Sequence, residues 1–314
     1  MTIEAKMILD SVSPDGIRLS TLQLHYPRAA LHEELMTHRA FSRNASSSRA
    51  IPVSKMIEAV MTDPYIPTHW GKNQKGMQAV EELHERVRVP INGFPGAFNE
   101  LDNEYAWLKA RDQAVIMARS FDEAGYHKQV VNLLLRPWEH IDVIVTSTEW
   151  ANFFALRRHT AAKPEFQTLA TMMADVMASN TPELVKPGQW HLPYITHEEF
   201  DILGGITGGE PYGDDWDPFI QMSVARNARV SSKNHDGTNP DPIKDIALHD
   251  VLVGSEPLHA SPAEHCATPD TGVHTISKPD GTIVWRGDND HQWGNFTGWV
   301  QYRKTLPNEY VRDR

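Results

Sequence analysis

The sequence is most unusual over residues 37–49, which read Thr37-His38-Arg39-Ala40-Phe41-Ser42-Arg43-Asn44-Ala45-Ser46-Ser47-Ser48-Arg49. Cations and hydroxyl groups are concentrated here. Arginine forks, hydroxyls and backbone N–H groups are the donors that a phosphate needs. Turns rich in Ser and Asn are also common in loops, so a solvated polar loop is the competing interpretation. The stretch is therefore a candidate anion-binding segment.

The flanking residues predict a strand and two helices. Residues 1–16 show no clear pattern and predict a loose start. Residues 17–26 alternate and are rich in β-forming side chains, which predicts a strand. Pro27 suits a first helical turn; the buried face of that helix would carry Leu31, Leu35, Met36 and Phe41. Ser54 is expected to cap a second, short helix.

Residues 74–179 predict mainly helix. The apolar residues spaced for buried faces are Val80, Leu83, Val87, Leu101, Trp107, Leu108, Val130, Val131, Leu134 and Leu135. Residues 141–145 form a β-branched run and predict a strand. Thr148 is expected to cap a helix over residues 149–158, and Pro164 to begin another that ends near Asn180.

The last third of the chain changes character. Residues 186–217 are rich in Pro and Gly and predict a loop, as do residues 233–242. Residues 223–230 predict a helix. Residues 275–285 predict a hairpin with Pro279-Asp280-Gly281 at its turn.

Composition excludes several classes of protein. The chain has 314 residues, a net charge of −11 and one cysteine. The acidic balance argues against binding of duplex nucleic acid. A single cysteine excludes an intrachain disulfide and a cysteine-rich metal site, and fits a reducing compartment. We see no signal peptide and no apolar run long enough for a membrane span, so a cytoplasmic protein without a membrane partner is expected.

Read as H-R-x-x-S-x-N-x-x-S-x-R, residues 38–49 resemble the R-H-R-x-x-S-x-N-x-x-S-x-R signature of flavin-dependent thymidylate synthases. Every specified position except the first Arg is present. The resemblance implies that His38 and Arg39 contact FAD. It also implies that Ser47 and Arg49 hold the nucleotide.

Residues 152–157 read Asn152-Phe153-Phe154-Ala155-Leu156-Arg157 and resemble the N-F-x-x-L-R helix of the same family. The resemblance implies that Asn152 and Leu156 line the flavin and that Arg157 meets the pyrimidine carbonyl. Taken alone, this segment is also a plain amphipathic helix with an exposed Arg. Its position downstream of the first motif favours the family interpretation.

Two further elements match the family out of order. Residues 225–231 resemble its R-A-A-R-V-S element, and residues 259–265 resemble G-H-x-[ST]-P-F-E-H. In the family both precede the R-H-R signature. A circular permutation explains the order, with new termini between the E-H element and the strand over residues 17–26; matching by chance is the alternative. The flavin-binding candidates that follow from the permutation are Ser231, His259, Ser261 and Glu264.

The chain departs from the family mainly on the nucleotide side. Thr37 replaces the first Arg of the signature. The family's A-R-x-x-L-P phosphate contact falls at Asn132-Leu133, with Arg136 as a candidate substitute. Glu34 stands where the family usually has a glutamine, on the substrate side. The remaining changes are Ala45, Ala50, Ala161 and Ala263. Because one lost charge-assisted contact costs ~1.5–3 kcal/mol, the identity of the nucleotide is open.

The resemblance implies an enzyme that transfers a one-carbon unit from methylene-tetrahydrofolate to carbon 5 of dUMP, with FAD as cofactor and NADPH as reductant. No protein nucleophile attacks the ring in that family, so we expect Cys266 to be structural. The protein would orient the pyrimidine against the flavin, and Arg157 would stabilise negative charge on the pyrimidine carbonyl.

Three alternatives stay open. The altered nucleotide side is compatible with a hydroxymethylase, or with a methylase that acts on dCMP or UMP. Loss of several ligand positions is compatible with a non-catalytic flavin-binding module. A metal enzyme is a further rival, since the chain has 16 histidines. There is no H-E-x-x-H helix or Cys-His finger spacing, and His249, His259 and His265 are merely near one another in sequence, so no metal site is expected.

The resemblance also implies an α+β fold, with an antiparallel or mixed sheet flanked by helices and a helical subdomain. We expect one domain over residues 1–314. Residues 17–180 would carry the signature and the helical part, and residues 220–304 the permuted segment. The family forms homotetramers whose active sites are shared between chains, so a homotetramer is expected here. The tail beyond residue 266 has no counterpart, but Arg303 and Lys304 are candidate replacements for the missing cations.

Overall fold

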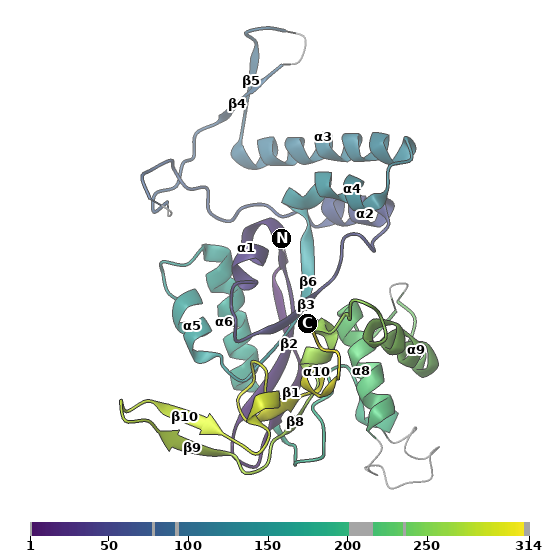
Figure 1. Cartoon of the computed structure of the whole chain (residues 1–314). Coiled ribbons are helices and arrows are strands. Elements are labelled where there is room, and N and C mark those ends of the chain that lie inside the picture. Colours follow the sequence, from purple (N-terminus) through teal and green to yellow (C-terminus); the bar gives the residue numbers. More distant parts are fainter. Residues whose placement is uncertain (1, 77–78, 92–93, 201–215, 235–236, 311–314) are drawn as a thin grey trace.

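A five-stranded sheet lies at the centre of the molecule (Figure 1). The structure, a computed structural model, describes residues 2–76, 79–91, 94–200, 216–234 and 237–310. The strand order is β3-β6-β2-β1-β7, antiparallel except for the parallel pair of β1 and β7. The strands are β1 (Glu4–Val12), β2 (Arg18–Pro27), β3 (Ser42–Ala45), β6 (His140–Ser147) and β7 (Glu183–Leu184). The two predicted strands are confirmed as β2 and β6.

The N-terminal prediction was wrong, because residues 4–12 form β1 rather than a loose start. The β1 sequence lacks a clean alternation, and its register with β2 shifts between Met7 and Leu9. A tight turn joins the two strands, with Gly16 at a positive φ of 78° and its N–H donating to the Ser13 carbonyl. Pairing with β2, rather than local patterning, therefore defines this strand.

Strand alternation gives the sheet two different faces. Leu22, Leu24 and Tyr26 of β2 point into the main core. That core is closed by α1 (Arg28–Leu35), α5 (Ala151–Arg157) and α6 (Pro164–Ser179). Thr21, Gln23 and His25 point to the opposite face. We call these the helix-covered face and the polar face. Pro164 begins α6 as predicted.

The polar face is covered only at one end. There Ile144 packs against Tyr194 and Val230, which come from the loop before α8 and from the C-cap of α8 (Asp217–Arg229). Figure 1 shows α8 and α9 (Pro242–Val253) on the side of the sheet away from α5 and α6. Helix α8 confirms the helix predicted over residues 223–230, whereas α9 was not predicted.

A helical subdomain lies beyond one end of the sheet (Figure 1). It contains α2 (Val53–Thr62), α3 (Asn103–Glu123), α4 (Lys128–Val131) and the 3-10 helix η1 (Asn132–Trp138). Its own core is made by Val53, Met56, Ile57, Val60, Val115, Ala118, Val131, Leu135 and Trp138. The predicted helical subdomain is thus present, and it packs against the rest of the chain next to β6.

The prediction of helix from residue 74 onward was too broad. Residues 87–101 form an exposed hairpin of β4 (Val87–Pro90) and β5 (Phe98–Leu101). Val80, Leu83 and Val87 are exposed rather than buried. The predicted caps were also wrong: α2 begins after Pro52 and α5 after Trp150, without a side-chain cap from Ser54 or Thr148. Apolar spacing misled here because these side chains have no opposing surface.

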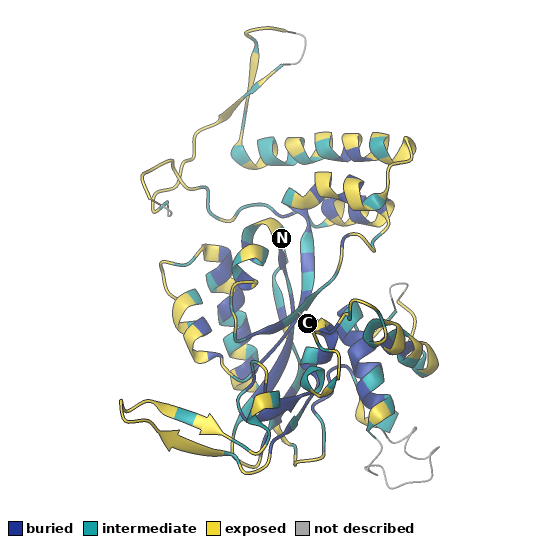
Figure 2. Cartoon of the chain, in the orientation of Figure 1, coloured by how far each residue is buried: buried dark blue, intermediate teal, exposed yellow. Residues whose placement is uncertain are grey.

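The C-terminal part is built from short elements. They are η2 (Ser261–His265), β8 (Ala267–Pro269), β9 (His274–Ser277), β10 (Ile283–Arg286), η3 (Asp290–Gln292), β11 (Trp299–Gln301) and α10 (Tyr302–Thr305). The predicted hairpin is confirmed as β9 and β10, which Figure 2 shows largely exposed. Of the loop predicted over residues 186–217, residues 201–215 lie outside the described residues. Leu19 of β2 packs with Ala267, Phe296 and Trp299, so the two ends of the chain share a core.

These elements make an α+β fold with a mixed sheet, as expected. Figure 2 shows the buried residues gathered in the central sheet and the surrounding helix faces. Among the described residues, no helix combines the length and the apolar character that a membrane crossing requires.

A buried chain of hydrogen bonds crosses the polar face. Ser11 Oγ lies 2.8 Å from His191 Nδ1, and His191 Nε2 lies 2.8 Å from Thr21 Oγ1. The hydroxyl groups of Thr21 and Thr146 hydrogen-bond to each other at 2.7 Å, and Thr146 Oγ1 lies 2.8 Å from His265 Nδ1. Burial lowers the pKa of both histidines to about 3. Both rings are therefore neutral at neutral pH.

We expect these two histidines to make the fold sensitive to acid. Because their pKa is about 3 in the fold against 6.5 for an unperturbed side chain, the unfolded chain binds more protons over that interval. The free energy of unfolding should fall as pH drops from 6.5 toward 3, by up to ~1.4 kcal/mol per pH unit for each ring. Urea unfolding at several pH values measures this slope. His265→Gln should flatten it and exposed His274→Gln should not; equal slopes in the wild type and His265→Gln would contradict the expectation.

Candidate functional site

The turn between α1 and β3 carries the first residues of the motif. Helix α1 ends at Leu35 instead of continuing to Phe41, which corrects the prediction. Arg43 Nη1 donates to the carbonyl groups of Leu35, Met36 and His38, and a cation is favourable at a helix C-terminus. Phe41 is nevertheless buried and packs its ring on Phe153. The turn is therefore fixed at both ends.

Glu34, His38 and Arg157 lie in direct contact. Arg157 Nη1 donates to Glu34 Oε2 at 2.9 Å, and Arg157 Nε donates to His38 Nε2 at 3.1 Å. Lys163 Nζ lies 2.5 Å from Glu34 Oε1. Two of the segments singled out in the sequence, residues 34–39 and 152–157, thus meet at one place. Lys163 was missed, because only the packing of α6 beside α1 brings it here.

His38 is held as a neutral acceptor. Burial first, and then the charge of Arg157, lower the pKa of His38. Its ring meets Phe153 edge-on, with centroids 5.0 Å apart and an interplanar angle of 84°. Since Nε2 accepts from Arg157, the ring proton of the neutral form is on Nδ1. His38 therefore positions the Arg157 guanidinium rather than repelling it.

The Arg157 guanidinium is pre-positioned by three partners. Beyond its bonds to Glu34 and His38, its Cζ lies 4.7 Å from the centroid of the Phe166 ring, an attractive cation–π geometry. The side chain is 21% exposed. Among the hydrogen bonds of the described residues, none uses Arg157 Nη2. That nitrogen is available to an acceptor on a ligand.

A cleft of about 970 Å³ opens beside this cluster. Glu34 and Arg157 line it from α1 and α5, and residues 160–167, 65–71 and 79–80 contribute to the other sides. Ligand sites of small molecules have volumes of roughly 300–1,000 Å³, so the cleft can take a nucleotide. Because Arg157 lies in the wall of the cleft, its guanidinium can donate a hydrogen bond to a ligand bound there.

The C-terminal segment lies against the same motif. Gln301 Nε2 donates to Ser42 Oγ at 3.2 Å and to the Glu264 carbonyl at 3.0 Å. Ser42 Oγ also donates to Asn295 Oδ1 at 3.1 Å. Glu264 lies close enough to act electrostatically on Arg43. Residues 37–49 and 261–265 are therefore neighbours within one chain. Asn295 and Gln301, which link them, belong to a part of the chain to which the sequence assigned no role.

A solved methylase structure is similar to part of the chain. It is described as the crystal structure of a UMP/dUMP methylase PolB from Streptomyces cacaoi bound with 5-Br UMP. The identity is 16%, the match covers 56% of this chain and 89% of that chain, and the TM-score is 0.38. No family model matches the chain, and no curated protein does. A likeness this weak does not establish a shared fold, and the function proposed below depends on the residues of this chain alone.

Glu264 is paired within the chain. Its Oε1 accepts from Arg303 Nη1, and Lys304 Nζ lies 2.9 Å from Glu309 Oε2. The two cations that were candidate phosphate ligands are thus engaged with carboxylates. Arg303 neutralises Glu264 instead.

The other predicted ligands lie at the surface without contacting one another. None of their side chains hydrogen-bonds to another candidate in the part of the chain that the structure describes. Ser231 is half-buried and its Oγ accepts from the Lys233 N–H at 3.0 Å. The exposed candidates are Arg39, Ser47, Arg49, Asn152, Leu156, His259 and Ser261. Asn152 and Leu156 are four residues apart and thus share one exposed face of α5.

Asn132 supports the loop over residues 48–51. It is buried, and its Nδ2 donates to the carbonyl groups of Ser48 and Ile51 at 2.8 and 3.1 Å. Arg136, the candidate substitute for the family's Arg, is exposed on η1. Asn132 therefore shapes the loop, whereas Leu133, which stands where the resemblance leads one to expect the Arg, is exposed and carries no charge.

Cys266 is structural, as expected. It is fully buried, and burial raises the pKa of its thiol to about 12. Its Sγ lies 3.3 Å from Ser223 Oγ and 3.6 Å from Asn227 Nδ2. A thiol in this environment stays protonated and is a poor nucleophile.

Proposed function

We propose that this chain is a flavin-dependent pyrimidine nucleotide methylase, which transfers a one-carbon unit from methylene-tetrahydrofolate to carbon 5 of dUMP and forms dTMP, with NADPH as reductant. The observation that carries the proposal is the direct contact of Glu34, His38 and Arg157 at the cleft. These residues come from two motifs that are far apart in the sequence. The packing of residues 261–265 on β3 is the arrangement that a circular permutation requires.

Arg157 is the group that we assign to the reacting pyrimidine. Its free Nη2 would donate to a ring carbonyl that gains negative charge in the reaction, and a fixed donor of this kind stabilises such charge without reorganising. Glu34 and His38 hold the guanidinium in place. Ser47 and Arg49 would hold the phosphate from the exposed end of the motif.

FAD, when bound, supplies the hydride that NADPH delivers. The residues fit a flavin that lies between chains rather than within one. Asn152 and Leu156 are exposed beside the helix-covered face, whereas Ser231 and His259 follow α8 and α9 at the polar face. His38 and Glu264 lie between them, around the edge strand β3. A second copy of the chain would bring exposed donors from the two sides to one cofactor, with Arg39 and Ser261 among them.

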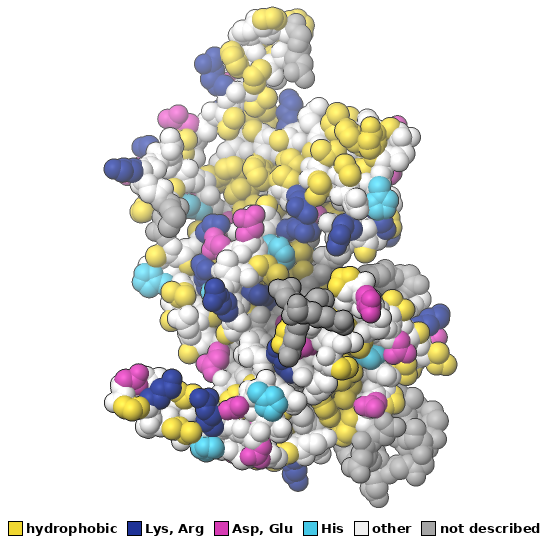
Figure 3. All heavy atoms as spheres, in the orientation of Figure 1, with side chains coloured by type: hydrophobic (Ala, Val, Ile, Leu, Met, Phe, Trp, Pro, Cys, Tyr) yellow, Lys and Arg dark blue, Asp and Glu magenta, His cyan; other side chains and the backbone are white. Residues whose placement is uncertain are grey.

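A homotetramer is part of this proposal. Figure 3 shows hydrophobic side chains gathered over the helical subdomain at the top of the view. The exposed apolar residues there include Ile116, Met117, Val130, Leu133 and Leu134. An apolar surface of this kind is typical of a protein contact. Light scattering on the purified protein measures the mass of the assembly.

The direct test is product mass. The FAD-loaded protein is incubated with methylene-tetrahydrofolate, NADPH and each of dUMP, dCMP and UMP, and the nucleotides are weighed by mass spectrometry. The proposal expects dUMP to become heavier by one CH₂ group, in a reaction that stops when FAD or the folate is left out. The absence of any heavier nucleotide, from protein that has bound FAD, would refute it.

A hydroxymethylase, or a methylase of dCMP or UMP, is the second candidate. The observation that favours it is the uncharged Leu133, which is exposed where the family has its phosphate-binding Arg. The same incubations distinguish the outcomes, because a hydroxymethyl product is heavier by CH₂O and the substrate is the nucleotide that changes mass. Protein that binds FAD but converts none of the three would instead indicate a non-catalytic flavin-binding module.

A further inference from the structure

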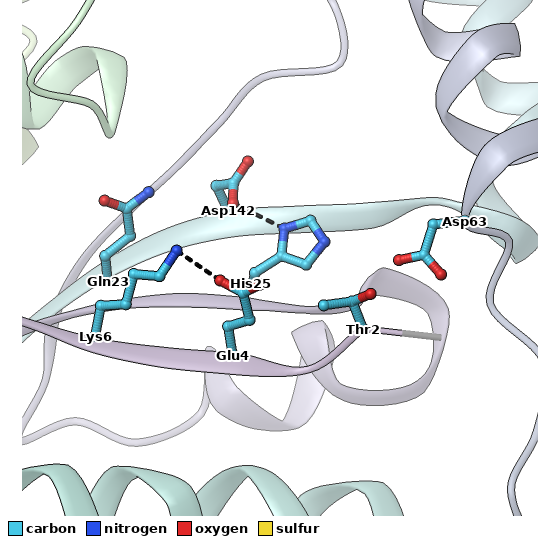
Figure 4. Close-up of a pocket in the computed structure, with 7 residues that line it drawn as sticks. All are labelled: Thr2, Glu4, Lys6, Gln23, His25, Asp63 and Asp142. Carbon is cyan, nitrogen blue, oxygen red and sulfur yellow. Dashed lines mark hydrogen bonds and ion pairs between the residues drawn. The ribbon is translucent and has the colours of Figure 1, made fainter.

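The uncovered end of the polar face contains a cluster of histidines and carboxylates. A pocket of about 200 Å³ lies there, lined by Glu4, Lys6, Gln23, His25 and Asp142 of the sheet, and by Thr2 and Asp63 (Figure 4). His25 of β2 is paired in register with Asp142 of β6, and Pro27 is paired with His140. Strand alternation therefore places His25, His140 and Asp142 on the same face. The sheet separates this cluster from Arg157, which lies with α5 on the helix-covered face.

His25 is oriented by a carboxylate. Its Nδ1 lies 2.8 Å from Asp142 Oδ1. Because an ionised carboxylate only accepts, Nδ1 carries a proton, and in the neutral ring Nε2 keeps its lone pair. Figure 4 shows the other ring nitrogen facing Asp63. A carboxylate behind a histidine is the usual outer partner of a metal-binding imidazole.

His140 has the matching arrangement. Its ring hydrogen-bonds to the backbone of Asp63. Its Nε2 is buried and has no hydrogen-bond partner, so the backbone bond uses Nδ1. A buried ring nitrogen without a partner costs free energy, and such an atom needs an explanation. A bound cation would accept its lone pair.

Asp63 completes the set from a different element. It is the residue at which α2 ends, and its side chain accepts a hydrogen bond from Thr2. One ligand atom from each of His25, Asp63 and His140 lies within 4.8 Å of the others. Two ligands on a tetrahedral ion with bonds of ~2.0–2.2 Å are roughly 3.3 Å apart. The ligand atoms must therefore close by at most roughly 1.5 Å to bind such an ion.

We propose that His25, His140 and Asp63 form a divalent transition-metal site that binds Zn²⁺, with Asp142 as the outer partner of His25. Two imidazole nitrogens and one carboxylate oxygen are ligands that Zn²⁺ prefers over Mg²⁺ or Ca²⁺. Three protein ligands leave a fourth position, which would face the pocket beside Glu4 and Lys6. The two rings are now stacked, with centroids 5.1 Å apart and planes 9° apart, so one ring tilts when the ion binds.

The site would fasten the helical subdomain to the sheet. His25 and His140 belong to β2 and β6, whereas Asp63 ends α2. An ion bound to all three would link these elements, and any ligand that binds only the folded chain stabilises it. Sequence spacing did not indicate the cluster, because the three residues are widely separated and only strand pairing brings them together.

The test measures the binding of Zn²⁺ to the metal-free full-length protein by calorimetry. The absorption spectrum of the Co²⁺-substituted protein reports the coordination of the ion. We expect one Zn²⁺ per chain, with micromolar or tighter affinity, and an increase in the thermal unfolding temperature. His140→Ala and Asp63→Asn should each lower the affinity at least 100-fold and remove the thermal shift. Asp142→Asn, which removes only the outer partner, should lower it about 10–100-fold.

His197→Ala is the matched control, since this exposed histidine also lies beside a carboxylate, that of Glu183, and it should bind Zn²⁺ like the wild type. Circular dichroism verifies that each variant is folded. Asp63→Asn is nearly isosteric, so it decides the outcome if a histidine variant unfolds. A wild type that binds no Zn²⁺ at micromolar concentration, or equal binding by the wild type and Asp63→Asn, would overturn the site.

Discussion

Arg157→Ala is expected to lower turnover of the nucleotide by roughly 10²–10³-fold, the usual effect of removing one fixed donor from developing negative charge. FAD should still bind, because Arg157 belongs to the nucleotide cleft and the flavin candidates keep their places. Glu34 retains Lys163 as a partner after the substitution, so no buried carboxylate is left unpaired. The measurements are kcat with dUMP at saturation and the flavin absorption of the purified variant.

Two matched variants make the Arg157 result specific. Arg158→Ala removes the adjacent, exposed arginine at the end of the same helix and should leave turnover unchanged. Arg157→Lys keeps the charge but loses the planar fork that bonds Glu34 and His38 together, so it should recover only part of the rate. Near-normal turnover in Arg157→Ala with flavin bound would exclude the proposed role.

The sequence predicted correctly those elements whose own residues carry the pattern of a strand, a helix start or a turn. Strands β2 and β6 are continuous β-rich runs, α6 begins at a proline, and β9 and β10 flank a Pro-Asp-Gly turn. The element β1 was missed because it depends on pairing with β2 across a register shift. The end of α1 was missed because it depends on Arg43, which lies five or more residues downstream and donates hydrogen bonds to the carbonyl groups of Leu35 and His38.

The site was predicted to the extent that motif residues touch one another. Glu34, His38 and Arg157 lie in contact, whereas the resemblance implied only that each contacts a ligand. Lys163, Asn295 and Gln301 were not predicted, because they reach the site only through tertiary packing. Their partners are backbone carbonyls or residues within the motif, and no local pattern marks such contacts.

The arginines of the R-x-x-R-V-S element have a role that the sequence did not indicate. Arg226 is 1% exposed. Its Nε donates to Asp245 Oδ2 at 2.9 Å, its Nη1 to the Tyr194 carbonyl at 2.8 Å, and its two terminal nitrogens to both oxygens of Glu199. The guanidinium therefore joins α8, α9 and the segment before α8.

Arg226→Ala should lower the free energy of unfolding by about 3–5 kcal/mol, because it leaves the carboxylate of Asp245 buried without its main partner. Arg229→Ala is the matched control on the same helix. Arg229 Nη2 lies 2.7 Å from Asp245 Oδ1 but lacks hydrogen-bond geometry, and its side chain is 11% exposed, so its loss should cost clearly less. Urea unfolding at neutral pH measures both. If the two variants lose equal stability, the net charge around Asp245, and not the hydrogen-bonded fork of Arg226, holds these helices together.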